Sequence, residues 1–505
     1  RVPAIADAGI RTFINGPEAF TPDNEFCLGP TDVAGFYVAA GFCAHGIAGA
    51  GGIGKVVAEW VLEGAPPMDL WHMDVRRFGQ SYRSPSYTLA RTVENYETYY
   101  DIRYPAHERS AGRPLRVSPE YAWHAAHGAS CGEKSGWERV NVYESNTTSD
   151  DESWRPRGWA GRNWSPGVVA EHRAARETAA LFDESSFAKI EVRGPDAARL
   201  MEWVCDNVVA RGTGSVTYTQ MLNARGGVEC DVTVTQTASD AFVVVTGTAF
   251  ANHDASWLRT QARETDADVT ITDVTGAWAC FGLWGPRARD LLQGLTPQDL
   301  GNDAFPFMSM RETTVGDVPV RLVRVTFVGE LGWELYCPTE YGAGLWQSLW
   351  AAGEPHGLVA GGYRAIDSLR LEKGYRVWGA ELDPAHTPYE SGLGFCVKLD
   401  KEFLGRDALA AQKAAGITQK LMCLVLDDVT QVALGNEPVQ RGGEVLGRVT
   451  SGGLGFHVGS SIAFAYLPVE IANGARVEVG IFGEWVGATV TRDPLYDPRS
   501  ERVRS

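Results

Sequence analysis

The carboxylate that best fits a chemical role in this 505-residue sequence is Asp231, just beyond an Arg-Gly-Gly turn. The run 218–233, YTQMLNARGGVECDVT, predicts a strand, a tight turn and a second strand starting at Asp231. Side chains alternate along a strand, so Thr233 lies on the same face as Asp231. A carboxylate in this position either stabilises the turn or acts as a general base beside a developing positive charge. The segment alone leaves both interpretations open.

A second candidate carboxylate, Glu334, lies in the run 325–336, VTFVGELGWELY. The pattern predicts a strand, a glycine turn and another strand, with Glu334 and Tyr336 on one face. A carboxylate beside aromatic side chains suits a flat heterocycle that bears an amino group and a ring N–H, because these groups donate two parallel hydrogen bonds to it. The alternative is a solvated hairpin with a cross-strand pair.

A G-x-G-x-x-G motif at Gly49–Gly54 lies between a short predicted strand (35–42) and a predicted helix. Dinucleotide binding requires a second strand that ends in an acid about 20 residues later. The sequence runs instead into Pro66 and Pro67, so we expect a glycine-rich turn that brings helix and backbone close together. Such a turn could still present helix N–H groups to a phosphate held by other parts of a larger domain.

A G-x-S-x-G motif at 128–132 and a candidate metal trio lie close together. The hydrolase motif requires a strand before Ser130, whereas the preceding YAWHAAH run predicts a helix. His124, His127 and Cys131 are spaced to share one helical face, but no obvious fourth ligand accompanies them. We therefore predict neither a nucleophilic serine nor a metal site.

The order of elements predicts an α+β chain of four units. Residues 1–78 hold turn-rich sequence, one short strand and one helix, which are too little to bury a core alone. Residues 79–150 are rich in Arg, Tyr and Trp and are expected to form a connecting domain with short helices. Residues 151–412 alternate helices with β-branched strands, whereas residues 413–505 alternate short strands with glycine turns. The last pattern predicts an antiparallel barrel or sandwich.

A strand–Gly-Pro–helix pattern occurs twice within the third unit. RGPDAARLM at 193–201 follows KIEV, and WGPRARDLL at 284–292 follows CFGL. Two copies of one supersecondary unit predict an internally duplicated domain.

The composition is that of an ordinary globular protein, with 44% hydrophobic and 22% charged residues and a net charge of −17. This negative charge, without a basic stretch, argues against nucleic acid as a partner. No apolar run approaches the roughly 20 residues that span a membrane, and the start RVPAIADAGIRTF lacks a signal-peptide core. Nine scattered cysteines without a CxxC pair indicate reduced thiols. We therefore expect a cytoplasmic protein without membrane contact.

Together these segments resemble the C-terminal part of the dimethylglycine and sarcosine dehydrogenase/oxidase family, which is itself similar to the glycine cleavage T-protein, an aminomethyltransferase. The resemblance covers nearly the whole chain in order. It implies folate-binding aminomethyltransferase-like domains and a C-terminal antiparallel β-barrel, preceded by an incomplete remnant of a flavin oxidoreductase domain. The stretches that carry it include FTPDNEFCLGP, GEKSGWERVNVYE, ARGGVECDVTV, GLWGPRARDLL, VGELGWELY, LRLEKGYRVWGAEL and SGLGFCVKLDKEFLGRDAL.

The resemblance also assigns roles to residues. It makes Asp231 the catalytic carboxylate and Glu334 the group that holds the pterin ring. Phe327 stands where the family often has tyrosine, and Ile366 stands where the glycine-cleavage branch has arginine, so the chain is closer to the demethylase branch. The positions that the resemblance places around the folate are Tyr218, Thr233, Val245, Phe327, Glu334, Leu335 and Tyr336.

The implied activity is tetrahydrofolate-dependent transfer of a methylene carbon from an N-methylglycine-type amine, which gives 5,10-methylenetetrahydrofolate. In complete members of the family a flavin domain first oxidises the amine, and its nucleotide-binding unit is not found in these residues. We therefore expect FAD only if the missing N-terminal segment, or a flavin-bearing partner chain or domain, supplies it. Two alternatives remain: a redox-free methyltransferase that makes 5-methyltetrahydrofolate, and a non-catalytic regulatory subunit.

Overall fold

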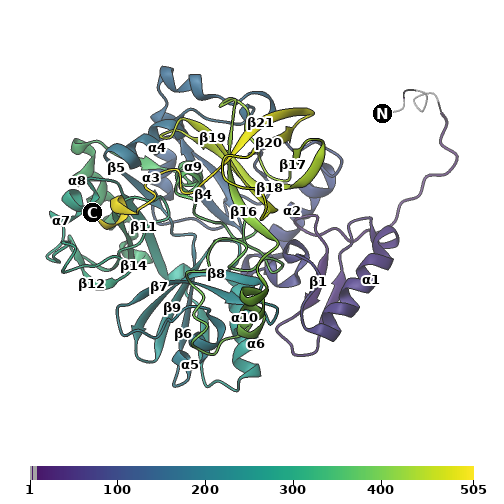
Figure 1. The fold of residues 1–505 in the computed structure, drawn as a ribbon, viewed down its shortest axis with the longest axis horizontal. Coiled ribbons are helices and arrows are strands. Elements are labelled where there is room, and N and C mark those ends of the chain that lie inside the picture. Colours follow the sequence, from purple (N-terminus) through teal and green to yellow (C-terminus); the bar gives the residue numbers. More distant parts are fainter. Residues whose placement is uncertain (1–2, 4–7) are drawn as a thin grey trace.

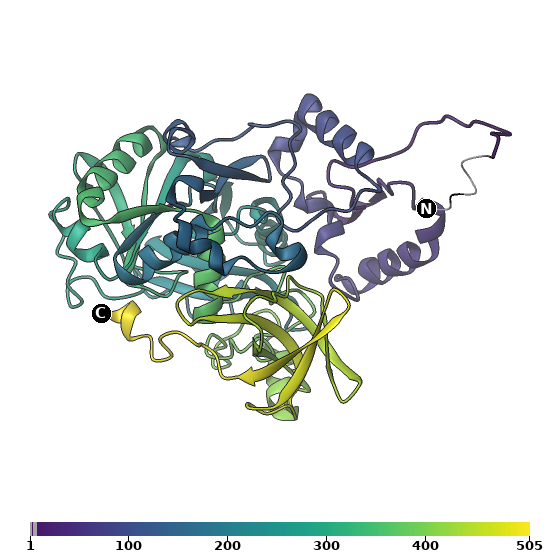
Figure 2. The same cartoon turned by 90° about the horizontal axis from the view of Figure 1, so that it is seen from above.

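The protein is described by a computed structural model that covers residue 3 and residues 8–505. The start of the predicted first unit, residues 1–2 and 4–7, lies outside these described residues. The N-terminal elements lie on one side of the molecule, and the two β-sheets and the C-terminal strands make up the rest (Figures 1 and 2). The chain is thus a mixed α+β structure, as the sequence predicts.

The N-terminal layer consists of strands β1 (Cys27–Pro30) and β2 (Tyr37–Ala40) beside helix α1 (Gly46–Glu63). The predicted glycine-rich turn at Gly49–Gly54 is wrong, because these residues form the first turns of α1. Each glycine inside a helix costs about 1 kcal/mol relative to alanine, and the helix forms despite several of them, with its Trp60 side chain buried. The Gly49 N–H already donates to a carbonyl at 2.8 Å within the chain. The motif therefore presents no turn to a phosphate.

The connecting region contains short helices and one hairpin, including helix α2 (Pro85–Glu97). Helix α3 (Tyr121–Ala126) confirms the helix predicted before Ser130. Ser130 itself lies in a hairpin of strands β3 (Ala129–Lys134) and β4 (Trp137–Tyr143). A serine in a two-stranded hairpin lacks the strand–turn–helix geometry of a nucleophile elbow.

Two sheets form the centre of the molecule. The first has the strand order β10-β6-β9-β8-β7, and the second has the order β12-β13-β14-β11-β5-β15. The first comprises β6 (Ala188–Arg193), β7 (Val216–Leu222), β8 (Val228–Ala238), β9 (Ala241–Thr246) and β10 (Thr270–Asp273). The second comprises β5 (Ala179–Asp183), β11 (Trp278–Trp284), β12 (Met310–Val315), β13 (Val318–Val323), β14 (Gly332–Pro338) and β15 (Leu358–Gly361).

The predicted internal duplication is confirmed by strand order. The series β6-β9-β8-β7 recurs as β11-β14-β13-β12. Strands β6 and β11 each lead through a Gly-Pro pair into a helix, α5 (Ala197–Val204) and α7 (Ala288–Gln293). Gly194 and Gly285 have φ angles of 148° and 144°, and a Cβ at either position would lie within 2.4 or 2.5 Å of a neighbouring carbonyl oxygen. Both turns therefore need glycine for the same physical reason.

Helices cover one face of each sheet. Helix α5 and helix α6 (Ala251–Glu264) pack on the first sheet in an apolar cluster that contains Val232. Helix α7 and helix α8 (Gly342–Gly353) cover the second sheet in a cluster that contains Trp346 and Leu335. These buried faces leave the opposite face of each sheet to form a site.

The C-terminal strands close into a barrel with the order β16-β19-β18-β17-β20-β21, which confirms the predicted antiparallel barrel. Its strands are β16 (Gln419–Leu426), β17 (Pro438–Arg441), β18 (Glu444–Gly455), β19 (Ser460–Pro468), β20 (Arg476–Ile481) and β21 (Glu484–Thr491). Across residue 3 and residues 8–505, no helix combines the length and apolar character that crossing a membrane requires.

A buried ionic network joins the barrel to helices α4 (Gly167–Glu177) and α9 (Tyr363–Lys373). The Arg176 guanidinium lies 3.0 Å from the Glu372 carboxylate, and neither side chain is exposed to solvent. The other oxygen of Glu372 accepts the backbone N–H of His457, in the loop between β18 and β19, at 2.8 Å. The barrel is therefore held to the helical layer by charge-assisted hydrogen bonds.

Candidate functional site

Asp231 lies within the first sheet, on strand β8. The strand begins at Val228 rather than at Asp231, because Val228 already pairs with Leu222 across the turn. Cys230 and Val232 pack into the apolar cluster beneath helices α5 and α6. Asp231 and Thr233 alternate with these residues and are half-buried, so they lie on the opposite face, as the sequence predicts.

The Asp231 carboxyl group has polar partners on the neighbouring strand β7. Gln220 pairs with Asp231 in the strand register, and its Nε2 donates to Oδ1 of Asp231 at 2.9 Å. Burial raises the pKa of Asp231 to about 7, although hydrogen bonds from Gln220 and Tyr218 lower it, and the nearby carboxylate of Asp206 raises it further. A carboxyl group with this pKa can hold or release a proton near neutral pH.

Three predicted site residues line up across the same face of the first sheet. Tyr218 pairs with Thr233, and Thr233 pairs with Val245. Val245 in turn pairs with Lys189 of β6, a lysine that is fully buried. The Lys189 Nζ donates to the Ser185 carbonyl at 2.8 Å, and burial lowers the pKa of this lysine.

Glu334 and Tyr336 lie together on strand β14 of the second sheet. The Tyr336 hydroxyl donates to the Glu334 carboxylate, which confirms that both side chains occupy one face. Burial raises the pKa of Glu334 to about 6, while the Tyr336 hydroxyl and the Lys189 cation lower it. Leu335 points to the other face, where it is fully buried in the cluster beneath α7 and α8. Only the backbone of Leu335 can therefore reach a ligand beside Glu334.

The strand predicted at 325–327 is wrong. Strand β13 ends at Val323, and the following residues form a loop around Thr326, whose hydroxyl accepts three backbone N–H groups. Phe327 stacks on Tyr375 with ring centroids 5.8 Å apart, and it packs against a different apolar cluster from Tyr336.

The inner faces of the two sheets meet in one apolar cluster. Val245 of the first sheet and Tyr336 of the second pack in it together with Val216 and Cys280. Strand pairing places Thr233 beside Val245 on the first sheet. On the second sheet, Glu334 lies two residues before Tyr336 on the same strand. The structure thus turns the face that carries Asp231 and the face that carries Glu334 toward one another. Phe327 and the Leu335 side chain lie outside this cluster.

Sequence reasoning missed two residues beside these predicted positions, Gln220 and Glu184. Gln220 could have been found, because alternation places it on the same face as Tyr218. Glu184 gives no such signal, because it follows strand β5 in the polar run DESS. Its side chain is nevertheless fully buried, and the charge of Glu334 raises its pKa.

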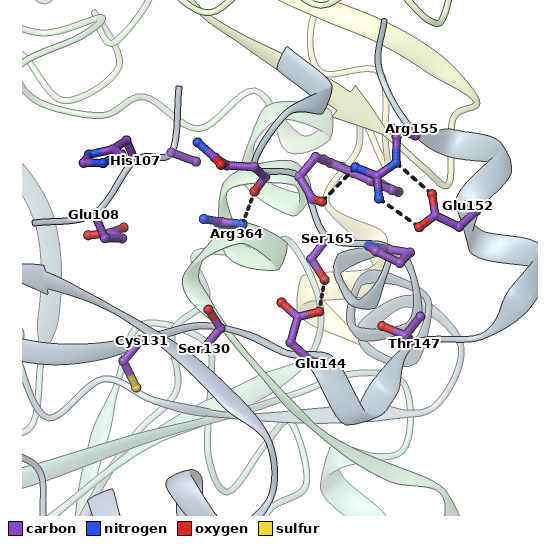
Figure 3. A pocket seen from close by; sticks show the side chains of 14 residues that line it. His107, Glu108, Ser130, Cys131, Glu144, Thr147, Glu152, Arg155, Ser165 and Arg364 are labelled. Carbon is purple, nitrogen blue, oxygen red and sulfur yellow. Dashed lines mark hydrogen bonds and ion pairs between the residues drawn. The ribbon is translucent and has the colours of Figure 1, made fainter. Parts of the chain in front are cut away.

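A polar cavity of about 750 Å³ lies elsewhere, in the connecting region (Figure 3). Its lining includes Ser130 and Cys131 but none of the predicted site residues. Several of its polar groups are already paired: Arg155 contacts Glu152 at 2.8 Å, and Ser165 donates to Glu144 at 2.7 Å. This cavity therefore does not bear on the predicted site.

The structure separates the candidate metal trio. His124 contacts Asp183 at 2.9 Å, His127 stacks on Trp123, and Cys131 lies on strand β3. Another group, Cys230, His253 and Asp254, places three potential ligand atoms within 4.8 Å of one another. Burial alone lowers the pKa of His253, but the hydrogen bond with Asp254 at 2.9 Å raises it more, so the pKa of His253 lies above its usual value.

Known protein families match most of the chain. Residues 120–401 match the GCVT N-terminal domain, residues 419–497 match the glycine cleavage T-protein C-terminal barrel domain, and residues 63–118 match the FAD dependent oxidoreductase central domain. The structure is similar to the crystal structure of the glycine cleavage system aminomethyltransferase T from Bartonella henselae, with a TM-score of 0.65 and 25% identity. That likeness covers 76% of this chain and 99% of the other.

Several curated relatives align with the whole chain. It is 38% identical over 506 residues to 4-methylaminobutanoate oxidase (formaldehyde-forming) of Paenarthrobacter nicotinovorans. It is 36% identical over 510 residues to the mitochondrial dimethylglycine dehydrogenase of Rattus norvegicus. The alignments cover 100% of this chain but only 61% and 58% of those relatives, so the chain spans about three fifths of their length.

Proposed function

The chain belongs to the glycine cleavage T-protein (aminomethyltransferase) family, and from this premise we propose that it transfers a one-carbon unit to tetrahydrofolate. In the proposed reaction, the methylene carbon of an oxidised N-methylglycine-type amine passes to the folate and gives 5,10-methylenetetrahydrofolate. The observation that carries the proposal is the meeting of the two inner sheet faces, one bearing Asp231 and the other bearing Glu334.

Asp231 is the proposed catalytic residue. The folate nitrogen that attacks an electrophilic carbon becomes positively charged as the bond forms, so a nearby carboxylate stabilises it and accepts its proton. With a pKa of about 7, the Asp231 carboxyl group releases and takes up protons close to neutral pH. Gln220 donates to Oδ1 of Asp231 and so fixes the orientation of the carboxyl group.

Glu334 is the proposed anchor of the pterin ring. The 2-amino group and the N3–H of a pterin form two parallel donors, and an ionised carboxylate accepts both. Tyr336 donates to Glu334 and so fixes the orientation of its carboxylate. Tyr218, Thr233 and Val245 would border the same ligand from the first sheet.

The residues of this chain do not fit a flavin dinucleotide at the G-x-G-x-x-G motif, because those glycines lie inside helix α1. No step proposed here uses a flavin held by the described residues. We propose that a flavin-bearing domain or partner chain supplies the oxidised amine, and the match of residues 63–118 to a domain of FAD dependent oxidoreductases supports this division.

Calorimetric titration with tetrahydrofolate under anaerobic conditions tests the proposal. Formaldehyde, or an N-methylglycine together with a flavin-dependent dehydrogenase that oxidises it, is then supplied. The folate product is identified chromatographically, and its rate of formation is compared with that of the same mixture without the protein. We expect tetrahydrofolate to bind and 5,10-methylenetetrahydrofolate to form. Formation of 5-methyltetrahydrofolate from a methylated sulfur or oxygen donor would support a redox-free methyltransferase instead. Absence of folate binding would contradict both reactions and favour a regulatory subunit.

A further inference from the structure

Glu184 is a buried carboxyl group without a hydrogen-bond partner, and it lies beside Glu334. Its side chain is fully buried, and neither of its oxygens has a partner among the described residues. Its backbone N–H donates to the Cys280 carbonyl at 2.8 Å, which holds it against strand β11. Gly282 of that strand pairs with Glu334, and a Cβ at Gly282 would lie 3.0 Å from Oε2 of Glu184. The side chains of Glu184 and Glu334 therefore both lie next to Gly282.

The two carboxyl groups are not equivalent. Burial raises the pKa of Glu184 well above its usual range, and the charge of Glu334 raises it further, whereas Lys189 lowers it. Glu334 accepts a hydrogen bond from Tyr336, which favours its ionised form. Two interacting carboxyl groups bind and release protons as a pair, and these surroundings favour the proton on Glu184 and the negative charge on Glu334.

A neutral carboxyl group and a carboxylate recognise different ligand edges. The carboxylate of Glu334 offers acceptors only, whereas neutral Glu184 offers one donor and one acceptor side by side. Buried polar groups in native structures have partners, so the missing partner of Glu184 is expected from a ligand. A ring with two hydrogen-bond donors on one edge satisfies the carboxylate of Glu334. If the adjoining edge of that ring carries a donor beside an acceptor, it also satisfies the neutral carboxyl group of Glu184.

We propose that Glu184 is a specificity-determining residue that recognises the reduced state of a pterin ring, an inference that rests on the proposed function. The 2-amino group and N3–H of the pterin face Glu334, and the adjoining edge presents N1 as acceptor and N8–H as donor. The other adjoining edge carries the reacting N5, which must face Asp231 on the first sheet. Glu184 therefore donates to N1 and accepts from N8–H. In fully oxidised folic acid N8 carries no hydrogen and is itself an acceptor. It then faces the acceptor oxygen of Glu184, so binding weakens.

Anaerobic calorimetry with tetrahydrofolate and with folic acid tests this assignment on the full chain. We expect the unmodified protein to prefer tetrahydrofolate by roughly tenfold or more. Glu184→Leu should weaken tetrahydrofolate binding roughly tenfold and remove the preference. Glu184→Gln should keep the preference, because an amide presents the same donor and acceptor. Glu334→Gln should weaken both ligands, because an amide cannot accept two parallel hydrogen bonds. The matched control Glu402→Leu, at a side chain 81% exposed, should change neither affinity.

Two results would overturn the assignment. One is a preference in Glu184→Leu equal to that of the unmodified protein, which would mean that Glu184 does not meet the ring. The other is a loss in Glu184→Gln as large as in Glu334→Gln, which would mean that Glu184 acts as an anion. If Glu184→Leu does not fold, the comparison of the two glutamine variants decides. If the unmodified protein does not bind tetrahydrofolate, the proposed function itself is overturned. This result is obtained before any variant is compared, so the two failures can be told apart.

Discussion

The side-chain amide of Gln220 donates to Oδ1 of Asp231 at 2.9 Å, from the position that pairs with Asp231 on the neighbouring strand. Gln220 is fully buried, so the donor end of this bond is shielded from water. It holds the carboxyl group of the proposed catalytic residue in one orientation while favouring the ionised form of that group.

Removal of the amide should shift the pH profile of the proposed reaction. In Gln220→Leu the ionised form of Asp231 loses a hydrogen bond, so its pKa rises above the value of about 7. A base must be ionised to act, so the acidic limb of kcat/KM should move to higher pH by about one unit. The control Gln440→Leu removes an amide that donates to Glu478 in the barrel. Identical profiles for both variants would contradict a positioning role for Gln220.

Replacement of Asp231 should separate binding from turnover. Asp231→Ala removes the proton acceptor but leaves Glu334 in place, so the Kd for tetrahydrofolate should change little while kcat falls by about 10²–10⁴-fold. Calorimetry and single-turnover product analysis measure the two effects. Asp240→Ala changes an exposed aspartate in the turn between β8 and β9 and should leave both values unchanged. A full kcat in Asp231→Ala would remove Asp231 from the mechanism.

Asp231 should also make the protein less stable as pH rises. Its pKa in the folded protein is about 7, against about 4 in an unfolded chain, so the folded state holds a proton between these values that the unfolded state has released. The free energy of unfolding therefore falls from about pH 4 to about pH 7. Asp231→Asn removes this dependence and should be more stable than the unmodified protein at pH 8 by about 1–4 kcal/mol, with a smaller gain at pH 5.5.

Urea unfolding at the two pH values measures this difference. Asp407→Asn is the matched control, because the Asp407 side chain is 97% exposed. A gain for Asp231→Asn that is equal at pH 5.5 and pH 8 would contradict the raised pKa.

The ionic network beneath the barrel should be essential for stability. Burial alone raises the pKa of Glu372, but His172 and Arg176 lower it to about 2, so Glu372 is ionised in the folded protein. Its stabilising effect is present above about pH 4 and is lost as the pH falls toward 2. Glu372→Gln leaves Arg176 buried without its counter-charge, which should lower the free energy of unfolding at pH 7 by about 3–5 kcal/mol. Glu470→Gln, at an exposed position, should change it by less than about 0.5 kcal/mol.

The parts of the site that depend on local rules were predictable from the sequence. Alternation and the Arg-Gly-Gly turn placed Asp231 and Thr233 on one face of a hairpin, and alternation placed Glu334 with Tyr336. The same rule indicates that the Leu335 side chain faces away, although the family resemblance included it. Local rules failed at Gly49–Gly54, where a glycine-rich run fits a turn and a helix start equally well until packing decides.

Glu184 could not have been predicted from the sequence. The run DESS is typical of a solvated turn, and the residue is buried only because strand β11 and its Gly282 lie against it. Val245 was assigned by resemblance alone, and its place beside Tyr336 depends on how two sheets distant in sequence pack together. Contacts of this kind depend on tertiary structure, which residue spacing does not encode.

The duplicated strand order gives every position in one half of the domain a counterpart in the other. Counted back from Gly194 and Gly285, Lys189 of β6 corresponds to Cys280 of β11, and their strand partners Val245 and Tyr336 correspond as well. A symmetric forerunner would have presented two identical half-sites across its axis. In this chain the two acids of the site, Asp231 and Glu334, lie in different repeats and at positions that do not correspond. Neither repeat therefore holds all the reactive groups. Exchanging the two repeats would not restore the site.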